Sequence, residues 1–173
     1  MALFIALICS FTDAGVSDFN ALVACGSGTP VPVQLCFVIA ACSKSAQFGF
    51  TGWLLSAMEG PTPVSALMHA ATLVTAGVVL LIKLNGIFSD WVVVLIFIVG
   101  SFTAIFSGIG ACTERDLKQI VALSTASQMG VAFIFIGLCD AQLAFIHIAA
   151  HAVFKSLLFW GVGLLNHAGQ HQY

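Results

Sequence analysis

Apolar residues fall in long runs along the chain, and short polar links separate the runs. A run of roughly 20 apolar residues is the length that a helix needs to cross a hydrocarbon core of about 30 Å. No alternating strand pattern is present, and a membrane then leaves only helices for such runs. The four clearest predicted spans are Pro63 to Leu84, Trp91 to Cys112, Leu117 to Cys139 and Leu143 to Leu165. Their short links predict antiparallel neighbours in a bundle.

The first part of the chain is less regular. Residues 1–32 read as a truncated apolar segment followed by a polar loop with turn chemistry. An apolar run from Val33 to Cys42 then leads to Lys44 and to a glycine-punctuated aromatic stretch. Because Lys44 falls well inside this span, an interrupted helix is predicted there. The predicted fold is an all-α, polytopic transmembrane helical bundle of about five spans, one of them broken. The bundle covers 33–165, and 166–173 form a short tail.

Composition agrees with lipid as the solvent, because 60% of the residues are hydrophobic and only 7% are charged. A soluble domain carries about 25% charged residues. The net charge of −2 and the lack of a basic stripe exclude nucleic acid as a partner. The six cysteines lack metal-ligand spacing and are interpreted as small hydrophobes. Most charges cluster at the links between spans, where interfacial side chains are expected; these are Lys83, Asp90, Glu114, Arg115, Asp116, Lys118 and Asp140.

Ionisable residues also interrupt the apolar pattern at depth. They are Lys44, His69, and the trio His147, His151 and Lys155. A charged lysine at the bilayer centre costs at least about 2.5–3.5 kcal/mol, so such residues indicate function. The trio has i, i+4, i+8 spacing, which places it on one helical ridge about 12 Å long. Three interpretations remain: a proton relay, interhelical hydrogen bonding, and metal or haem ligation by the two histidines. No third ligand type lies nearby, which favours the relay over a metal.

Hydroxyl side chains near these residues are secondary candidates. Thr72 and Thr75 follow His69 on the same predicted helix, and Ser124 and Ser127 belong to a polar tract in another span. Such residues line a hydrated channel or make helix–helix hydrogen bonds. Both interpretations are carried forward.

Four blocks of the sequence resemble NADH dehydrogenase subunit 5, the antiporter-like membrane-arm subunit of respiratory complex I. They are Lys44-Ser45-Ala46-Gln47, the segment from Met58 to Val78 with its G-P-T-P-V-S-A-L core, Asp116 to Gly130, and the H-x-x-x-H-A-x-F-K run from His147 to Lys155. Mrp-type cation/proton antiporters share much of this signature. The resemblance implies that Lys44 is the central lysine of a broken helix. It also implies that His69, His147, His151 and Lys155 belong to a central hydrophilic axis that carries protons. Gly49 stands where relatives usually have proline, which puts the geometry of the break in question.

The same resemblance implies the molecular context. The chain is expected to be a fragment of proton-pumping NADH:ubiquinone oxidoreductase that itself holds no cofactor and no metal. Flavin, iron–sulfur clusters and quinone are expected in partner subunits. Separate chains are expected to supply the missing N- and C-terminal parts of the subunit, including a glutamate that pairs with Lys44. The expected location is the mitochondrial inner membrane, or alternatively a bacterial plasma membrane. A subunit of a sodium/proton antiporter and a purely structural fragment are the competing functions.

Overall fold

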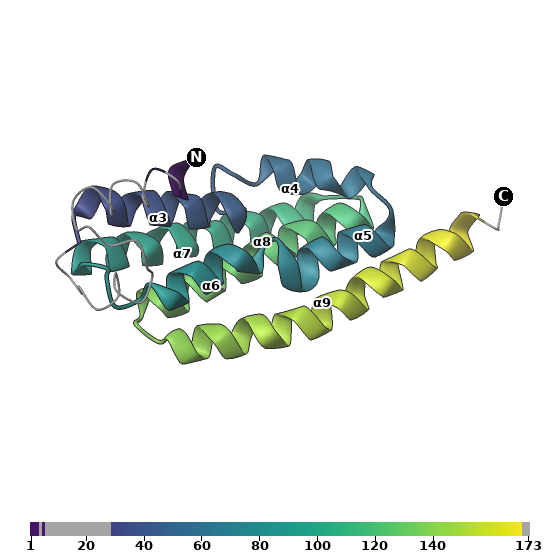
Figure 1. The fold of residues 1–173 in the computed structure, drawn as a ribbon. Helices are drawn as coiled ribbons and strands as arrows, with labels where there is room; N and C mark the ends of the chain where they lie inside the picture. The colour runs from purple at the N-terminus through teal and green to yellow at the C-terminus, as the bar shows by residue number, and fades with distance from the viewer. Residues whose placement is uncertain (4, 6–28, 171–173) are drawn as a thin grey trace.

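The computed structural model describes residues 1–3, 5 and 29–170 (Figure 1). Most of the predicted segment 1–32, including Cys9 and Cys25, therefore lies outside the described residues. From residue 29 onward the elements are helical and no strand occurs. In chain order they are α3 (Val31–Lys44), α4 (Gly52–Ser56), η2 (Ala57–Glu59), α5 (Thr62–Leu67), η3 (Met68–Thr72), α6 (Thr75–Lys83), α7 (Asp90–Thr113), α8 (Leu117–Gly137) and α9 (Ala141–Gln170). The predicted tail from residue 166 begins inside α9.

Four stretches are long and apolar enough to cross a membrane: Pro63–Lys83, Asp90–Thr113, Leu117–Gly137 and Ala141–Ala168. They confirm the four predicted spans, with ends that differ by a few residues. Polar residues at the helix starts explain part of the difference. The Asp140 carboxylate, for example, accepts a hydrogen bond from the backbone N–H of Leu143 at 2.9 Å, which starts α9 before its first apolar run. The chain is a polytopic α-helical membrane protein.

The helix predicted to break at Lys44 does break there. α3 ends at Lys44, and the chain becomes helical again only at Gly52. Between them Ala46 and Gly49 adopt the left-handed conformation, with φ of 48° and 88°. Glycine adopts this conformation without strain, whereas proline, with φ fixed near −65°, is incompatible with it. The glycine at position 49 therefore suits a turn that proline would not allow.

A second irregularity lies inside the span Pro63–Lys83 and was not predicted. Met68–Thr72 form a π-helical turn, η3, between α5 and α6. The N–H of Leu73 reaches back five residues to the Met68 carbonyl at 3.3 Å. Single π turns within α-helices occur frequently at functional sites. Hydropathy does not reveal such a turn, because it leaves the apolar run unbroken.

α7 and α8 pack against each other over most of their length, and α8 also contacts α9 (Figure 1). Two glycines allow the close crossing of α7 and α8. A Cβ added to Gly130 would lie 2.7 Å from both the Ala104 nitrogen and the Gly100 oxygen. One added to Gly100 would lie 2.7 Å from the Phe133 Cβ. Small residues that let backbones approach are the usual basis of helix pairing in lipid.

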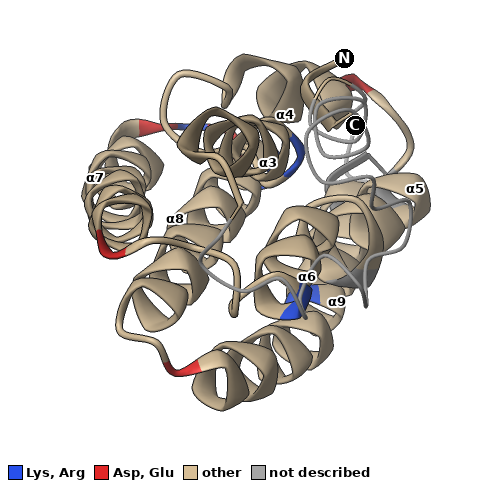
Figure 2. Ribbon diagram, turned by 60° about the vertical axis from the view of Figure 1, so that its left-hand side comes forward, with Lys and Arg blue, Asp and Glu red and all other residues tan. Residues whose placement is uncertain are grey.

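The charges of the bundle lie mostly where the chain turns between helices (Figure 2). Its outer surfaces expose many large apolar side chains. On α7, large apolar side chains such as Phe102, Ile105 and Ile109 are each more than half exposed. α9 exposes a similar apolar face along its length. Lipid is the solvent that suits these faces. Among the described residues, Lys155 is the exception to the charge pattern, since it lies well inside α9.

One buried glutamine holds the ends of two helices together. The Gln34 amide nitrogen donates to the Thr29 carbonyl at 2.9 Å, and its oxygen accepts from the backbone N–H of Ser89 at 2.8 Å. This links the start of α3 to the start of α7. Both halves of the amide are therefore satisfied within the chain.

We expect Gln34→Leu to destabilise the protein by about 1–3 kcal/mol, because it leaves buried groups of Thr29 and Ser89 without their partner. Thermal unfolding of the detergent-solubilised protein measures the effect. Gln142→Leu, at an exposed position on α9, is the matched control and should leave the melting temperature unchanged. Equal melting temperatures for the two variants would contradict the structural role of Gln34.

Candidate functional site

Lys155 lies in the interior of the bundle and is held by α8. Its side chain is 1% exposed. The ammonium donates hydrogen bonds to the Val121 carbonyl at 3.0 Å and to the Ser124 hydroxyl. Both partners are uncharged oxygens. Because burying an ammonium with neutral partners is costly, it indicates a function rather than a contribution to stability.

Two imidazoles lie close to Lys155. His151, one turn earlier on α9, is completely buried, and His69 on η3 is 1% exposed. The η3 turn that carries His69 packs against α9, the helix that carries His151 and Lys155. The His69 ring packs against Phe159, with centroids 5.3 Å apart. We refer to His69, His151 and Lys155 as the His–Lys cluster.

The ring nitrogens of the cluster are open for further partners. By hydrogen-bond geometry, neither nitrogen of His69 nor of His151 has a partner among residues 29–170. The His151 ring approaches the backbone of Ala70 without reaching that geometry. Buried polar atoms are normally paired, so exceptions require an explanation.

His147 extends the cluster along α9. It is half-buried, and its Nε2 lies 3.1 Å from the Gln128 carbonyl of α8. Its ring meets Phe135 edge-on at a centroid distance of 5.5 Å. The ridge of His147, His151 and Lys155 predicted from their spacing thus faces the interior on one continuous helix. His69 reaches this ridge from a different part of the chain, through the contact of η3 with α9.

Lys44 is exposed and is not part of the His–Lys cluster. Its side chain is exposed at the end of α3 and lines a small pocket of about 210 Å³ with Ser43, Trp53 and Leu73. Lys44 lies within an apolar stretch of the sequence, but its side chain is not buried within this chain. α3 ends at this residue, and the side chain leaves the helix end toward the surface.

The four hydroxyl candidates separate into different roles. Only Ser124 contacts the cluster, through its hydrogen bond with Lys155. Ser127 donates to the Ala104 carbonyl at 2.8 Å and so ties α8 to α7. Thr72 is exposed and bonds back to Leu67, whereas Thr75 is buried and donates to the Thr72 carbonyl at 3.4 Å. Ser127 therefore makes a helix–helix hydrogen bond, one of the two roles predicted for these residues. Thr72 faces away from the interior of the bundle.

Sequence reasoning did not single out the polar side chains of the break. The Ser45 hydroxyl donates to the Val74 carbonyl at 2.8 Å, and the Phe48 N–H donates to the Thr103 hydroxyl at 2.9 Å. These bonds anchor the break to the residue that precedes α6 on one side and to α7 on the other. The sequence signal that could have revealed them is the polar Ser-x-Gln sequence directly after a lysine in an apolar span.

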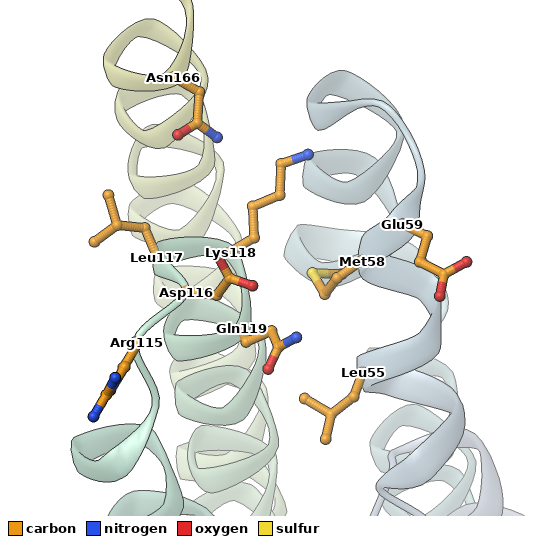
Figure 3. A pocket seen from close by; sticks show the side chains of 9 residues that line it. All are labelled: Leu55, Met58, Glu59, Arg115, Asp116, Leu117, Lys118, Gln119 and Asn166. Carbon is orange, nitrogen blue, oxygen red and sulfur yellow. The ribbon is translucent and has the colours of Figure 1, made fainter. Parts of the chain in front are cut away.

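A polar pocket of about 600 Å³ lies at one end of the bundle, between α4–η2 and the start of α8 (Figure 3). Lys118 extends across it and donates to the Gly60 carbonyl at 3.4 Å. Its lining is Leu55, Met58, Glu59, Arg115, Asp116, Leu117, Lys118, Gln119 and Asn166. The pocket ends at Gln119, two residues before Val121, which accepts the hydrogen bond of Lys155. The pocket therefore lies beside the first turn of α8, which precedes the turn that binds Lys155.

The fold and this site define a multi-span helical membrane protein that keeps histidine and lysine side chains in its interior. A family model described as "NADH:quinone oxidoreductase/Mrp antiporter, TM" matches residues 1–173. The chain belongs to this family of membrane subunits, as its sequence motifs predicted. Within the described residues, no three His, Cys, Asp or Glu side chains gather as metal ligands.

The curated relatives are subunits of NADH oxidoreductases, whereas a solved structure with the same fold is an Mrp complex. The chain is 48% identical to NADH-ubiquinone oxidoreductase chain 5 of Ascaris suum over 78% of its length, and 47% identical to NADH-quinone oxidoreductase subunit L of Campylobacter jejuni over 91%. It covers only 25% and 26% of these relatives. A solved Mrp complex from Dietzia sp. DQ12-45-1b contains the same fold, with a TM-score of 0.89 and 34% identity over 96% of this chain and 20% of that one. The chain thus spans about a quarter of the length of its curated relatives.

Proposed function

We propose that this chain is part of a proton-translocating unit in the membrane arm of NADH:quinone oxidoreductase. The observation that supports the proposal best is the His–Lys cluster. Two buried imidazoles with unpartnered nitrogens adjoin a buried ammonium in a membrane protein. Histidine gains and loses a proton within the physiological range, which makes it the natural relay group. Protons pass between His69, His151 and Lys155, and His147 extends the path along α9.

In this proposal, the polar pocket beside Lys118 forms the outer end of the proton path on the Lys155 side. Ser124 positions the ammonium and supplies a hydroxyl between the cluster and α8. An ion path needs groups that bind protons in sequence without holding any proton too tightly. A lysine held by neutral oxygens and flanked by imidazoles meets this need, because no carboxylate fixes its charge among its observed hydrogen-bond partners.

In this proposal, Lys44 acts together with a residue from the rest of the subunit. Its relatives are about four times longer than this chain, so much of the subunit surrounds the fragment described here. We place a carboxylate of that remainder against Lys44, whose exposed side chain lines the small pocket with Trp53 and Leu73. Leu73 directly follows the π turn that carries His69, so this pocket lies beside the end of that turn.

The partners and location follow the same proposal. The remainder of the subunit and the other subunits of the complex pack around the bundle, and lipid covers the rest. Flavin, iron–sulfur and quinone chemistry belong to those partners, and this chain supplies proton transfer alone. The membrane is the mitochondrial inner membrane, in line with the mitochondrial-type chain 5 relatives.

His151→Leu and His69→Leu test the relay in the purified complex after reconstitution into liposomes. Each variant should slow NADH-driven proton uptake through this unit about 10²-fold, the contribution typical of a positioned proton-transfer group. Phe145→Leu, at an exposed position on α9, is the control and should pump normally.

The readout is the ratio of protons moved to NADH oxidised. If this ratio stays at the wild-type value in both histidine variants, the relay is contradicted. Repeating the assay in sodium-free medium separates proton pumping from sodium/proton exchange. Proton uptake that requires sodium would favour the antiporter function instead.

A further inference from the structure

Gln47 is a polar residue of the break between α3 and α4, and it has no role in the proposed relay. It follows Lys44 by three residues and is completely buried. The residues on either side of it are anchored to different helices, Ser45 to Val74 and Phe48 to Thr103. The Gln47 side chain therefore lies inside the bundle at the break, whereas Lys44 lies on its surface.

Hydrogen bonding fixes the orientation of the Gln47 amide. Its Nε2 lies 3.2 Å from the Ser45 carbonyl oxygen, which only accepts hydrogen bonds. The amide nitrogen must therefore be on this side and the oxygen on the other. Oε1 is buried and has no donor among residues 29–170. An amide oxygen left in this way is costly, and an apolar side chain of the same length would avoid the cost.

The other buried glutamine of this region shows the contrast. Gln34 is as buried as Gln47, yet both halves of its amide are paired, with Thr29 and with Ser89. Gln34 thus has a structural role that its hydrogen bonds explain. Gln47 has an open acceptor in the interior, which structural bonding does not explain.

The break is also in contact with the segment that follows the His69 turn. Gly77 approaches α3 so closely that an added Cβ would lie 2.3 Å from the Ala41 carbonyl oxygen. Val74, which accepts the Ser45 bond, lies five residues after His69, or about 7 Å along a helix. Irregular backbone at membrane depth is tolerated where it lines protein or a hydrated cavity.

We propose that Gln47 Oε1 accepts a hydrogen bond from an internal water at the break, and that Gln47 is a positioning residue for proton transfer between the Lys44 end of α3 and the His69 turn. The amide orders the water and does not itself carry the proton. Ser45 adds a second site for the same water, because its hydroxyl donates to Val74 and keeps its lone pairs free to accept. This proposal rests on the proton-translocating function proposed above.

The test compares Gln47→Met, Gln47→Glu and the exposed control Gln142→Leu in the intact complex in liposomes. Methionine keeps the length and removes the acceptor, and should reduce NADH-driven proton uptake about tenfold without changing the amount of assembled complex. Glutamate keeps an acceptor oxygen and should restore at least half of the wild-type uptake. A merely structural role would not separate these two variants in this way. Gln142→Leu should pump normally.

A high-resolution map of the wild-type complex gives the second readout. We expect a water within about 3.2 Å of Gln47 Oε1. A protein side chain from the rest of the complex at that place would overturn the proposal, as would normal pumping by Gln47→Met. If Gln47→Met fails to assemble, the map decides. Normal pumping by Lys155→Met would instead overturn the proposed function, so the two failures can be told apart.

Discussion

Lys155→Met will slow proton translocation through this unit about 10²-fold or more, while the complex assembles in normal amounts. The lysine is the buried cation of the His–Lys cluster and is hydrogen-bonded to α8, and methionine fills a similar volume without an ionisable group. Assembly is preserved because no donor is left without a partner. The Ser124 hydroxyl already donates to the Val121 carbonyl at 2.9 Å. Replacing a buried charge with an apolar group of similar volume is often neutral or stabilising.

The measurement is the ratio of protons taken up to NADH oxidised in liposomes that contain the complex. Lys83→Met is the matched control, because Lys83 is exposed at the end of α6. It should leave the ratio unchanged. Ser124→Ala should have a smaller effect than Lys155→Met, since it removes only one of the two bonds that hold the ammonium. A wild-type ratio in Lys155→Met would remove Lys155 from the path.

Gly130→Ala should destabilise the protein by about 1–3 kcal/mol, even though it adds a single methyl group. The new Cβ would lie 2.7 Å from two backbone atoms of α7, the Ala104 nitrogen and the Gly100 oxygen. Backbone atoms of a packed helix cannot move aside as a flexible side chain can. α7 and α8 must therefore separate, which also strains the hydrogen bond from Ser127 to Ala104.

The same substitution at Gly108 provides the control on the same pair of helices. A Cβ there would lie 3.5 Å from the Ser127 hydroxyl, which is an ordinary contact. Gly108→Ala should be neutral or stabilising, because alanine favours a helix over glycine by about 1 kcal/mol. Thermal unfolding in mild detergent compares the two variants. Equal melting temperatures would show that the α7–α8 crossing is looser than described.

The membrane spans and the interruption at Lys44 were predictable because they depend on local sequence. Hydropathy over a window of residues decides which segments enter lipid, and a lysine inside such a segment marks a discontinuity. The shared face of His147, His151 and Lys155 follows from helical periodicity alone. The π turn around His69 was not predictable, because it changes hydrogen bonding without changing the apolar pattern.

The roles of individual polar residues were harder to predict. Ser124 and Ser127 belong to one tract, yet Ser124 meets Lys155 and Ser127 meets α7. Residues three apart on a helix point in directions that differ by only about 60°, so the sequence did not show that the two side chains meet different neighbours. Thr72 and Thr75 separate in the same way into an exposed and a buried position. Which face meets a neighbour depends on how the helices pack.

By itself the sequence determined the class of protein, the four spans, the position of the break and the alignment of three ionisable residues on α9. These depend on length, apolarity and the 3.6-residue period, which operate within one segment. Only the tertiary structure decided that His69 joins His151 and Lys155, that Lys44 faces outward, and that Gln47 keeps an open acceptor inside. Those outcomes depend on contacts between segments far apart in the chain, through helix crossings, a π turn and two left-handed residues that no local pattern contains.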